Sequence, residues 1–299
     1  GSLRKIDWMT RRGWALFSLV GLIWGVPYMF MKVAVKEIDT TVIVFSRLVI
    51  GASLLLPIAL WQGSLRPAFK YLKYIFFYCL LEMVGPWYLI TSSQRDLSSG
   101  VVALLVATVP IWATLFAHHT GDTTAAHGTR IFGIAVGLIG IMLIVGLESV
   151  NEIRNMVSLI KVLLASLLYA WAMNMVSRRV KDVSGVAINA LAMIMAALVC
   201  LPFAVLSWPA NTPSHQAIFA TVGLGILCTG IAFWVYFLVL NEVGPARASL
   251  VVYPNTAVAV LLGIIILNEP LTLAIGVGLP LVLIGSYFAS RKTPSAQIA

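Results

Sequence analysis

The sequence predicts an all-α integral membrane protein in which ten transmembrane helices form two inverted five-helix repeats around a central cavity. Three observations predict this fold: the composition, ten apolar runs, and landmarks that recur at one spacing. Of the 299 residues, 60% are hydrophobic and only 10% are charged, and the mean hydropathy is +0.97. Because a soluble domain carries about 25% charged residues, this chain is expected to lie in a membrane.

Ten apolar runs are each long enough to cross a bilayer, which takes about 20 residues of helix. The connections are short and contain turn-forming residues, so no soluble domain fits between the runs. The predicted spans are 13–33, 40–61, 71–92, 98–118, 129–147, 156–177, 184–206, 216–240, 246–267 and 271–289. The expected division is an N-terminal tail at 1–12, a first repeat at 13–147, a connecting loop at 148–155, a second repeat at 156–289 and a C-terminal tail at 290–299. Gly1-Ser2 is typical of an expression-vector remnant, and no cleavable signal peptide is evident.

Lys and Arg are distributed unevenly between the predicted loops, and cytoplasmic loops are enriched in these residues. With the N-terminus inside, the inner side receives Arg4, Lys5, Arg11, Arg12, Arg66, Lys70, Lys73, Arg130, Arg178, Arg179, Lys181, Arg247, Arg291 and Lys292. The outer side receives Lys32, Lys36, Arg95, Arg154 and Lys161, while Arg47 lies within the second span. The pattern predicts cytoplasmic termini. The net charge of +9 therefore reflects topology and not a nucleic-acid partner, which would need a basic patch on a soluble face.

Neither cysteine nor histidine points to a disulfide, a metal or another cofactor. Cys79, Cys200 and Cys228 lie inside apolar runs, where they act as small apolar residues. The sequence HHTGDTTAAH holds a possible metal cluster of His118, His119, Asp122 and His127. Its spacing matches no tight metal signature, and these residues fall in a predicted cytoplasmic loop. We therefore expect no metal site and no cofactor.

Landmarks of the first half recur about 145 residues later, as an internal repeat requires. The matching pairs are Pro57 with Pro202, Pro110 with Pro254, Trp87 with Trp234, Lys32 with Arg178, and Asp122 with Glu269. Each half has five predicted spans, an odd number, so the two halves must be inverted relative to each other. Inverted repeats around a site at the membrane midplane are typical of secondary transporters.

Several segments resemble the drug/metabolite transporter superfamily in its ten-helix EamA-type branch. They are GLIWGVPYMFMKVAV with VIVFSRLVIGASLLLP in the first half, LSSGVVALLVATVPIWATLFA, and VGPARASLVVYPNTAVAVLLGIIILNEPLT in the second half. Gly121-Asp122 departs from the pattern, since Gly-Glu is usual there. The abundance of aromatic residues in the central spans is most similar to bacterial aromatic amino acid exporters. The resemblance implies export of small molecules across a bacterial inner (plasma) membrane.

The segment FFYCLLEMVGPWYLI, at 76–90, places a carboxylate and a proline at membrane depth. Glu82 lies about eleven residues into its span, near the midplane, and a charge that faced lipid there would cost several kcal/mol. It is expected to face the bundle, with Tyr78 one turn away as a hydrogen-bond donor and Arg47 as a possible partner. Two interpretations remain open: a proton or substrate-amine site, or a structural bridge between Glu82 and Arg47.

Prolines inside spans free a backbone carbonyl that lipid cannot satisfy. The candidate hinges of this kind are Pro27, Pro86, Pro110 and Pro254. We expect these spans to bend around a polar or water-filled space. The alternative is a packing kink in which a neighbouring Ser or Thr satisfies the carbonyl.

Deep aromatic residues predict a substrate site that is apolar with a few polar groups. The candidate binding residues are Trp112, Trp171, Tyr88, Tyr78, Asn174, Trp24, Trp234 and Tyr253. A substrate ring is expected to stack on Trp112, Trp171 and Tyr88, with Asn174 holding the amino acid head. Each of these residues could instead be a core or lipid-facing residue.

A secondary transporter that exports aromatic or other neutral amino acids by alternating access accounts best for these features. No nucleotide-binding loop of the form GxxxxGK[ST] occurs, so transport is expected to be passive or driven by an ion or substrate gradient. No soluble ATPase subunit is implied. The expected partners are a small-molecule substrate and membrane lipid. The alternatives are a carrier for a different substrate class, an intramembrane enzyme, and a channel. An enzyme would need paired acid–base groups or metal ligands at depth, and a channel would need polar rings along a pore.

Overall fold

The computed structural model describes residues 10–121, 128–148, 153–244 and 248–290, and throughout this part of the chain the regular elements are helices. A helical segment lies at each predicted position. The α-helices are α1 (Arg11–Ala34), α2 (Thr40–Trp61), α3 (Leu65–Ala68), α4 (Leu72–Cys79), α5 (Gly85–Ser93), α6 (Ser99–Val106), α7 (Val109–His119), α8 (Gly128–Glu148), α9 (Ile153–Arg179), α10 (Gly185–Leu206), α11 (His215–Gly225), α12 (Ala232–Val243), α14 (Val252–Ile265) and α15 (Leu273–Ser290).

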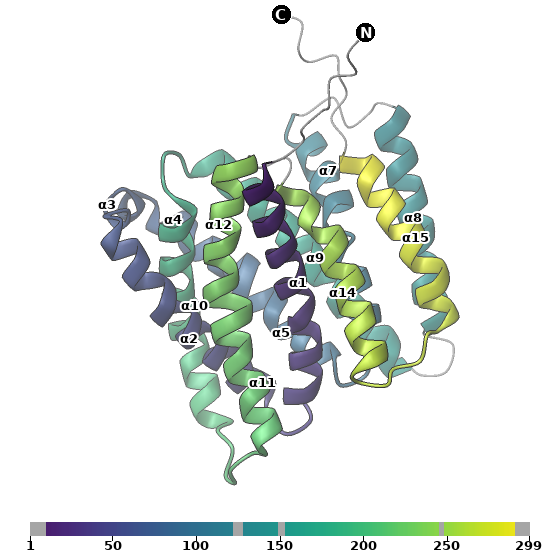
Figure 1. Cartoon of the computed structure of the whole chain (residues 1–299), viewed down its shortest axis with the longest axis horizontal. Helices are drawn as coiled ribbons and strands as arrows, with labels where there is room; N and C mark the ends of the chain where they lie inside the picture. Colours follow the sequence, from purple (N-terminus) through teal and green to yellow (C-terminus); the bar gives the residue numbers. More distant parts are fainter. Residues whose placement is uncertain (1–9, 122–127, 149–152, 245–247, 291–299) are drawn as a thin grey trace, which may run out of the picture.

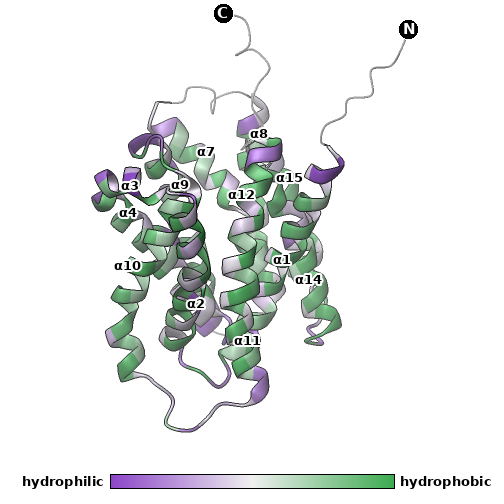
Figure 2. Ribbon diagram, turned by 60° about the vertical axis from the view of Figure 1, so that its left-hand side comes forward, coloured by the Kyte–Doolittle hydropathy of each residue, from purple (hydrophilic) through white to green (hydrophobic). Residues whose placement is uncertain are grey.

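Eight helical stretches are long and apolar enough to cross a membrane within the described residues. They are Arg11–Ala34, Thr40–Trp61, Leu65–Ser93, Ser99–His119, Gly128–Glu148, Ile153–Arg179, Gly185–Leu206 and His215–Val243. Ser249–Ile265 and Leu273–Ala289 are apolar but shorter. Figure 2 shows the apolar residues along the middle of the helices and the hydrophilic residues gathered at their ends, as a bilayer requires.

Side-chain caps explain where several helices begin. Thr10, Asp39, Ser98, Ser184 and Ser214 each precede a helix and accept a hydrogen bond from a backbone N–H of its first turn. Such caps satisfy donors that have no partner within the helix. The sequence therefore fixes these boundaries locally, and the predicted starts agree with them to within a few residues.

The helices lie roughly side by side and form one bundle (Figure 1). Helix α1 begins and helix α15 ends at the same end of the bundle, which we call the terminal face; the opposite end is the far face. Helices α8 and α15 pack along their length, and α1 packs against α14 and α12. Gly133 and Gly137 of α8 and Gly285 of α15 allow this close approach, because a Cβ on Gly285 would lie 2.6 Å from the Cα of Gly137.

The helical spans depart from α geometry near three of the four predicted hinge prolines. Pro86 follows a π-helical turn, Leu80–Val84, and Pro254 follows a 3₁₀ turn, Ser249–Val251. Pro110 is the second residue of α7, which follows a break at residues 107–108. Pro27, in contrast, lies inside the unbroken α1.

Hydroxyl groups of neighbouring helices satisfy carbonyls at the break between α6 and α7. Ser166 of α9 donates to the carbonyl of Leu105 at 3.1 Å, and Ser286 of α15 donates to the carbonyl of Ala107 at 2.8 Å. The two carbonyls flank that of Val106, which Pro110 frees, so these serine contacts resemble the packing kink of the alternative interpretation without reaching the freed carbonyl itself. The break is thus held by the surrounding protein.

A second π-helical turn, Ile226–Ile231, lies between α11 and α12. It occupies the place in the second half that Leu80–Val84 occupies in the first, but no proline follows it. π-Helical turns are rare and often mark functional sites. Both turns contribute side chains or carbonyls to the region described next.

Candidate functional site

A cavity of about 350 Å³ lies between helices of both halves of the chain. Its volume is at the lower end of the range for small-molecule sites. The side chains around it are mostly aromatic or apolar. They are Trp24, Pro27, Tyr28, Met31, Arg47, Tyr78, Glu82, Trp87, Ile90, Val106, Val109, Tyr169, Met173, Asn189, Phe233, Tyr236, Phe237, Val252 and Asn255.

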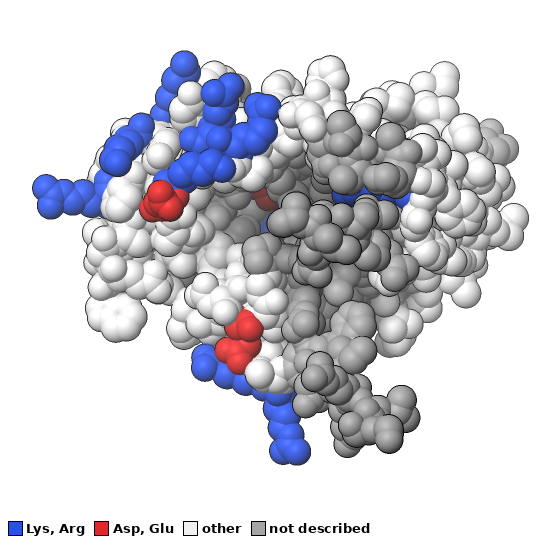
Figure 3. Space-filling view, turned by 90° about the horizontal axis from the view of Figure 1, so that it is seen from above, with Lys and Arg blue, Asp and Glu red and all other residues white. Residues whose placement is uncertain are grey.

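The cavity extends toward the terminal face. Asn189 lies in the first turns of α10 and Val252 begins α14, and both helices start at that end of the bundle. Figure 3 views the terminal face and shows a hollow in it, with basic side chains gathered around part of its edge. The exposed basic residues of this end are Arg11, Arg12, Arg66, Lys70, Lys73, Arg178, Arg179 and Lys181.

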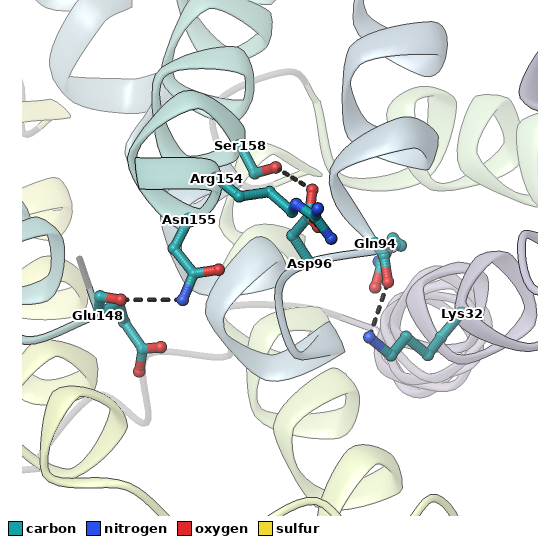
Figure 4. A network of polar contacts seen from close by, with 7 residues as sticks. All are labelled: Lys32, Gln94, Asp96, Glu148, Arg154, Asn155 and Ser158. Carbon is teal, nitrogen blue, oxygen red and sulfur yellow. Dashed lines mark hydrogen bonds and ion pairs between the residues drawn. The ribbon is translucent and has the colours of Figure 1, made fainter. Parts of the chain in front are cut away.

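Hydrogen bonds join the helix ends at the far face. Lys32 of α1 donates to the carbonyls of Gln94 and Leu97, at 2.7 and 2.8 Å, in the connection between α5 and α6 (Figure 4). Glu269 accepts from the backbone N–H and the hydroxyl of Ser99, each at 2.9 Å. A cation thus lies at the end of α5 and an anion at the start of α6, the arrangement that helix dipoles favour.

Asp96 extends this far-face polar network to α9. It accepts a hydrogen bond from Ser158 at 2.8 Å and lies 3.8 Å from the guanidinium of Arg154 (Figure 4). Asn155 donates to the carbonyl of Glu148 at 3.1 Å, which joins the end of α8 to the start of α9. The network therefore connects α1, α5, α6, α8 and α9 on the side opposite the hollow.

Arg47 is the cation of the cavity, and protein groups hold it in place. Its Nε donates to the hydroxyl of Thr229 at 2.8 Å, and its guanidinium lies over the ring of Trp87, 3.9 Å from the centroid. Thr229 belongs to the π-helical turn Ile226–Ile231 and donates in turn to the carbonyl of Leu224 at 2.8 Å. The cation–π contact and the hydrogen bond compensate for the loss of water around the charge.

Glu82 is the anion of the cavity and lies in the other π-helical turn, Leu80–Val84. Its Oε2 is buried and has no hydrogen-bond partner, and no ion pair joins Glu82 to Arg47. The structure therefore lacks the salt bridge between Glu82 and Arg47, which was one of the two interpretations of the sequence. Tyr78 does not donate to Glu82 either, because its hydroxyl donates to Asn189 on α10 at 2.9 Å.

Of the predicted binding residues, Trp24 and Tyr78 line the cavity, and the other six do not. Trp24 also donates to the carbonyl of Cys228 at 3.2 Å. Trp171, Tyr88 and Trp234 point outward, with 51%, 44% and 45% of their surfaces exposed. None of Trp112, Trp171 and Tyr88 lines the cavity, so the expected stack of these three rings around a substrate in the cavity does not form in this structure.

The remaining predicted residues also lie away from the cavity. Trp112 donates to the hydroxyl of Thr108 at 2.9 Å, within its own helical span. Asn174 donates to Thr120 at 3.3 Å, and Tyr253 packs against the ring of Tyr287. Of the charged and hinge residues, Glu82, Arg47 and Pro27 line the cavity.

Helical rotation explains which aromatic residues face inward. Residues two apart on a helix are separated by about 200°, so Trp171 faces outward when Tyr169 faces the cavity. Adjacent residues differ by about 100°, and Phe233 lines the cavity while Trp234 does not. The inward-facing rings absent from the prediction are Tyr28, Trp87, Tyr169, Phe233, Tyr236 and Phe237. The spacing of Phe233, Tyr236 and Phe237, at i, i+3 and i+4, is the sequence signal that marks one helix face.

The described residues contain no group of three His, Cys, Asp or Glu side chains that could hold a metal ion. Of the possible histidine cluster, Asp122 and His127 lie outside the described residues. The three cysteines are free and buried. In the described part of the chain, the polar groups of the cavity are therefore the carboxylate of Glu82, the guanidinium of Arg47, the side-chain amides of Asn189 and Asn255, and the polar groups of the Tyr and Trp rings.

The chain belongs to the EamA-like transporter family, whose family model matches it twice, over residues 11–146 and 156–291. It is 28% identical to the uncharacterized transporter YoaV of Bacillus subtilis, over 91% of this chain and 96% of that protein. It is 29% identical to the uncharacterized inner membrane transporter YedA of Escherichia coli, over 95% of this chain and 94% of that protein. A crystal structure of another protein shares the fold with a TM-score of 0.66, 16% identity and coverage of 93% and 96%. The chain is accordingly an integral membrane protein of a transporter family.

Proposed function

We propose that this protein exports small organic metabolites, aromatic or other neutral amino acids, across a bacterial inner membrane by alternating access. The observation that carries the proposal is the central cavity itself. It is lined by rings from both halves and by residues in the first turns of α10 and α14 at the terminal face, and no residue of the far-face polar network is among its lining residues. A carrier needs such one-sided access, because a path open at both ends would conduct as a channel does.

The arrangement of the chain supports two inverted repeats of five spans each. The family model matches two successive segments of similar length. In each segment the third span contains a π-helical turn beside the cavity, Leu80–Val84 in one and Ile226–Ile231 in the other. Rocking of one repeat against the other would open the far face and close the terminal face. The ten-span count includes the shorter helices α14 and α15.

The charge distribution supports cytoplasmic termini. The exposed basic residues near the hollow lie on the terminal face, and positively charged loops favour the cytoplasm. In this orientation the cavity is accessible from the cytoplasm, the side from which an exporter loads its substrate. YedA, a similar protein, is described as an inner membrane transporter.

Exchange in proteoliposomes tests the proposal. Purified protein is reconstituted into liposomes loaded with unlabelled phenylalanine, and uptake of radiolabelled phenylalanine is followed over time. A carrier is expected to show transient accumulation of label, because internal substrate accelerates entry. Label that equilibrates at the same rate with and without internal phenylalanine indicates a channel, and no uptake of any neutral amino acid refutes the proposed substrate class.

A further inference from the structure

The cavity contains one carboxylate that has no partner of its own. Among the described residues that line it, Glu82 and Arg47 are the only charged ones. Arg47 is already held by Thr229 and Trp87, whereas Oε2 of Glu82 is buried without a hydrogen bond. A buried acceptor without a donor is costly, and the cost is greater for a charged group. The empty acceptor therefore marks the place where a donor from a ligand would bind.

No described side chain occupies that place. Tyr78, one turn away, donates its hydroxyl to Asn189, and Asn189 uses its own amide N–H on the carbonyl of Gly185 at 2.8 Å. These two contacts tie Tyr78 and Asn189 to each other and to the backbone. The structure thus keeps the carboxylate free of internal donors while leaving it at the wall of the cavity.

Aromatic rings line the same cavity as this carboxylate. Tyr169, Tyr236, Phe233 and Trp24 line the same cavity, and the ring of Trp24 packs against Phe233 and Tyr236 with centroids 5.6 and 4.8 Å apart. The faces of aromatic rings attract organic cations. A carboxylate beside such rings has the chemistry that binds an ammonium group carried on an apolar body.

We infer that Glu82 binds the protonated amine of the transported substrate, so that the amine, more than the carboxylate, is required for recognition. This inference rests on the proposed function, in which the cavity is the transport site, and it narrows the substrate class to organic ammonium compounds, amino acids included. The guanidinium of Arg47 orients an anionic end where the substrate has one. Its engagement with Trp87 and Thr229 makes it the weaker determinant.

Three probes of similar size separate the two charges of an amino acid. Phenylalanine carries both an amine and a carboxylate, phenethylamine carries only the amine, and 3-phenylpropanoate carries only the carboxylate. Binding to purified full-length protein in detergent is measured by isothermal titration calorimetry for the wild type, Glu82→Gln and Glu82→Asp. Glu242→Gln serves as the matched control, because Glu242 is an exposed carboxylate that accepts from Thr10 outside the cavity.

The wild type and Glu242→Gln are expected to bind phenylalanine and phenethylamine more tightly than 3-phenylpropanoate. Glu82→Gln is expected to weaken both amines by roughly 10- to 100-fold, the value of one charge-assisted hydrogen bond, and to leave 3-phenylpropanoate unchanged or tighter. Glu82→Asp, which keeps the charge, is expected to retain the preference for amines. Melting in detergent identifies variants that fail to fold, and the wild-type preference alone then tests the inference.

Three results would overturn the inference and leave the proposed function standing. The first is phenylalanine binding that is equally tight in the wild type and Glu82→Gln. The second is a wild-type preference for 3-phenylpropanoate over phenethylamine, and the third concerns pH. If Glu82→Gln changes only the pH dependence of exchange and not the selectivity for amines, Glu82 carries a proton and the inference is also refuted. Failure of the wild type to bind or exchange any of the probes contradicts the proposed function itself.

Discussion

The guanidinium carbon of Arg47 lies 3.9 Å from the centroid of the Trp87 ring. The two residues come from α2 and α5, and the hydrogen bond from Arg47 to Thr229 adds a third segment from the second half of the chain. A single cation at membrane depth therefore joins three elements around the cavity. Its charge is tolerated because each of its neighbours offers negative potential.

Replacing this guanidinium by an amine should destabilise the bundle. Arg47→Lys keeps the charge but loses the planar group that lies over Trp87 and reaches Thr229. We expect the free energy of unfolding in detergent to fall by about 1–2 kcal/mol. Arg179→Lys is the matched control, because Arg179 is exposed and lies 6.0 Å from the Tyr74 ring. Equal destabilisation by the two substitutions would contradict the structural role of Arg47.

Tryptophans that face the cavity and tryptophans that face lipid should differ in their effect on transport. Trp24 lines the cavity and donates to the carbonyl of Cys228, whereas Trp171 is 51% exposed on the outer surface. Trp24→Ala is expected to slow phenylalanine exchange by about tenfold or more, since one aromatic contact contributes about 1–3 kcal/mol. Trp171→Ala should exchange at nearly the wild-type rate. The reverse order in proteoliposomes would place the substrate elsewhere.

The far face should loosen when Lys32 loses its ammonium group. Lys32→Met removes two hydrogen bonds to the connection between α5 and α6, while Lys36→Met changes an exposed lysine of the same face. Lys32→Met is expected to raise amide hydrogen exchange at residues 94–100 by about tenfold, and Lys36→Met should leave it unchanged. If neither variant alters exchange there, these hydrogen bonds do not hold the far face closed.

The contact between α8 and α15 should not tolerate a methyl group. A Cβ on Gly133 would overlap the backbone nitrogen of Ala289 and lie 2.7 Å from the carbonyl of Gly285. Gly133→Ala is therefore expected to lower the melting temperature in detergent, with a loss of about 1–3 kcal/mol. Gly146→Ala in the same helix meets no atom within 4 Å and should be neutral or slightly stabilising. Similar melting temperatures for both variants would contradict the close helix approach.

The residues of the site could be predicted only in part, because the local sequence of a membrane helix does not show which of its faces lines the cavity. The sequence placed Glu82 and Arg47 at membrane depth, and the structure places both at the cavity. It did not distinguish Tyr169 from Trp171, which lie on opposite faces of α9. In a soluble helix a polar face marks the surface, but lipid is as apolar as a protein core, so both faces of α9 carry large apolar side chains.

The sequence by itself determined that the chain lies in a membrane and, to within a few residues for most spans, where the helical spans lie. These features depend on local chemistry: caps such as Asp39 and Ser184, prolines such as Pro86, and apolar runs of bilayer length. Only the tertiary structure decided which groups meet: Tyr78 with Asn189, Arg47 with Trp87 and Thr229, and Glu82 with no internal donor. The physical reason is that such pairs depend on how neighbouring helices pack, and packing is a property of the whole bundle.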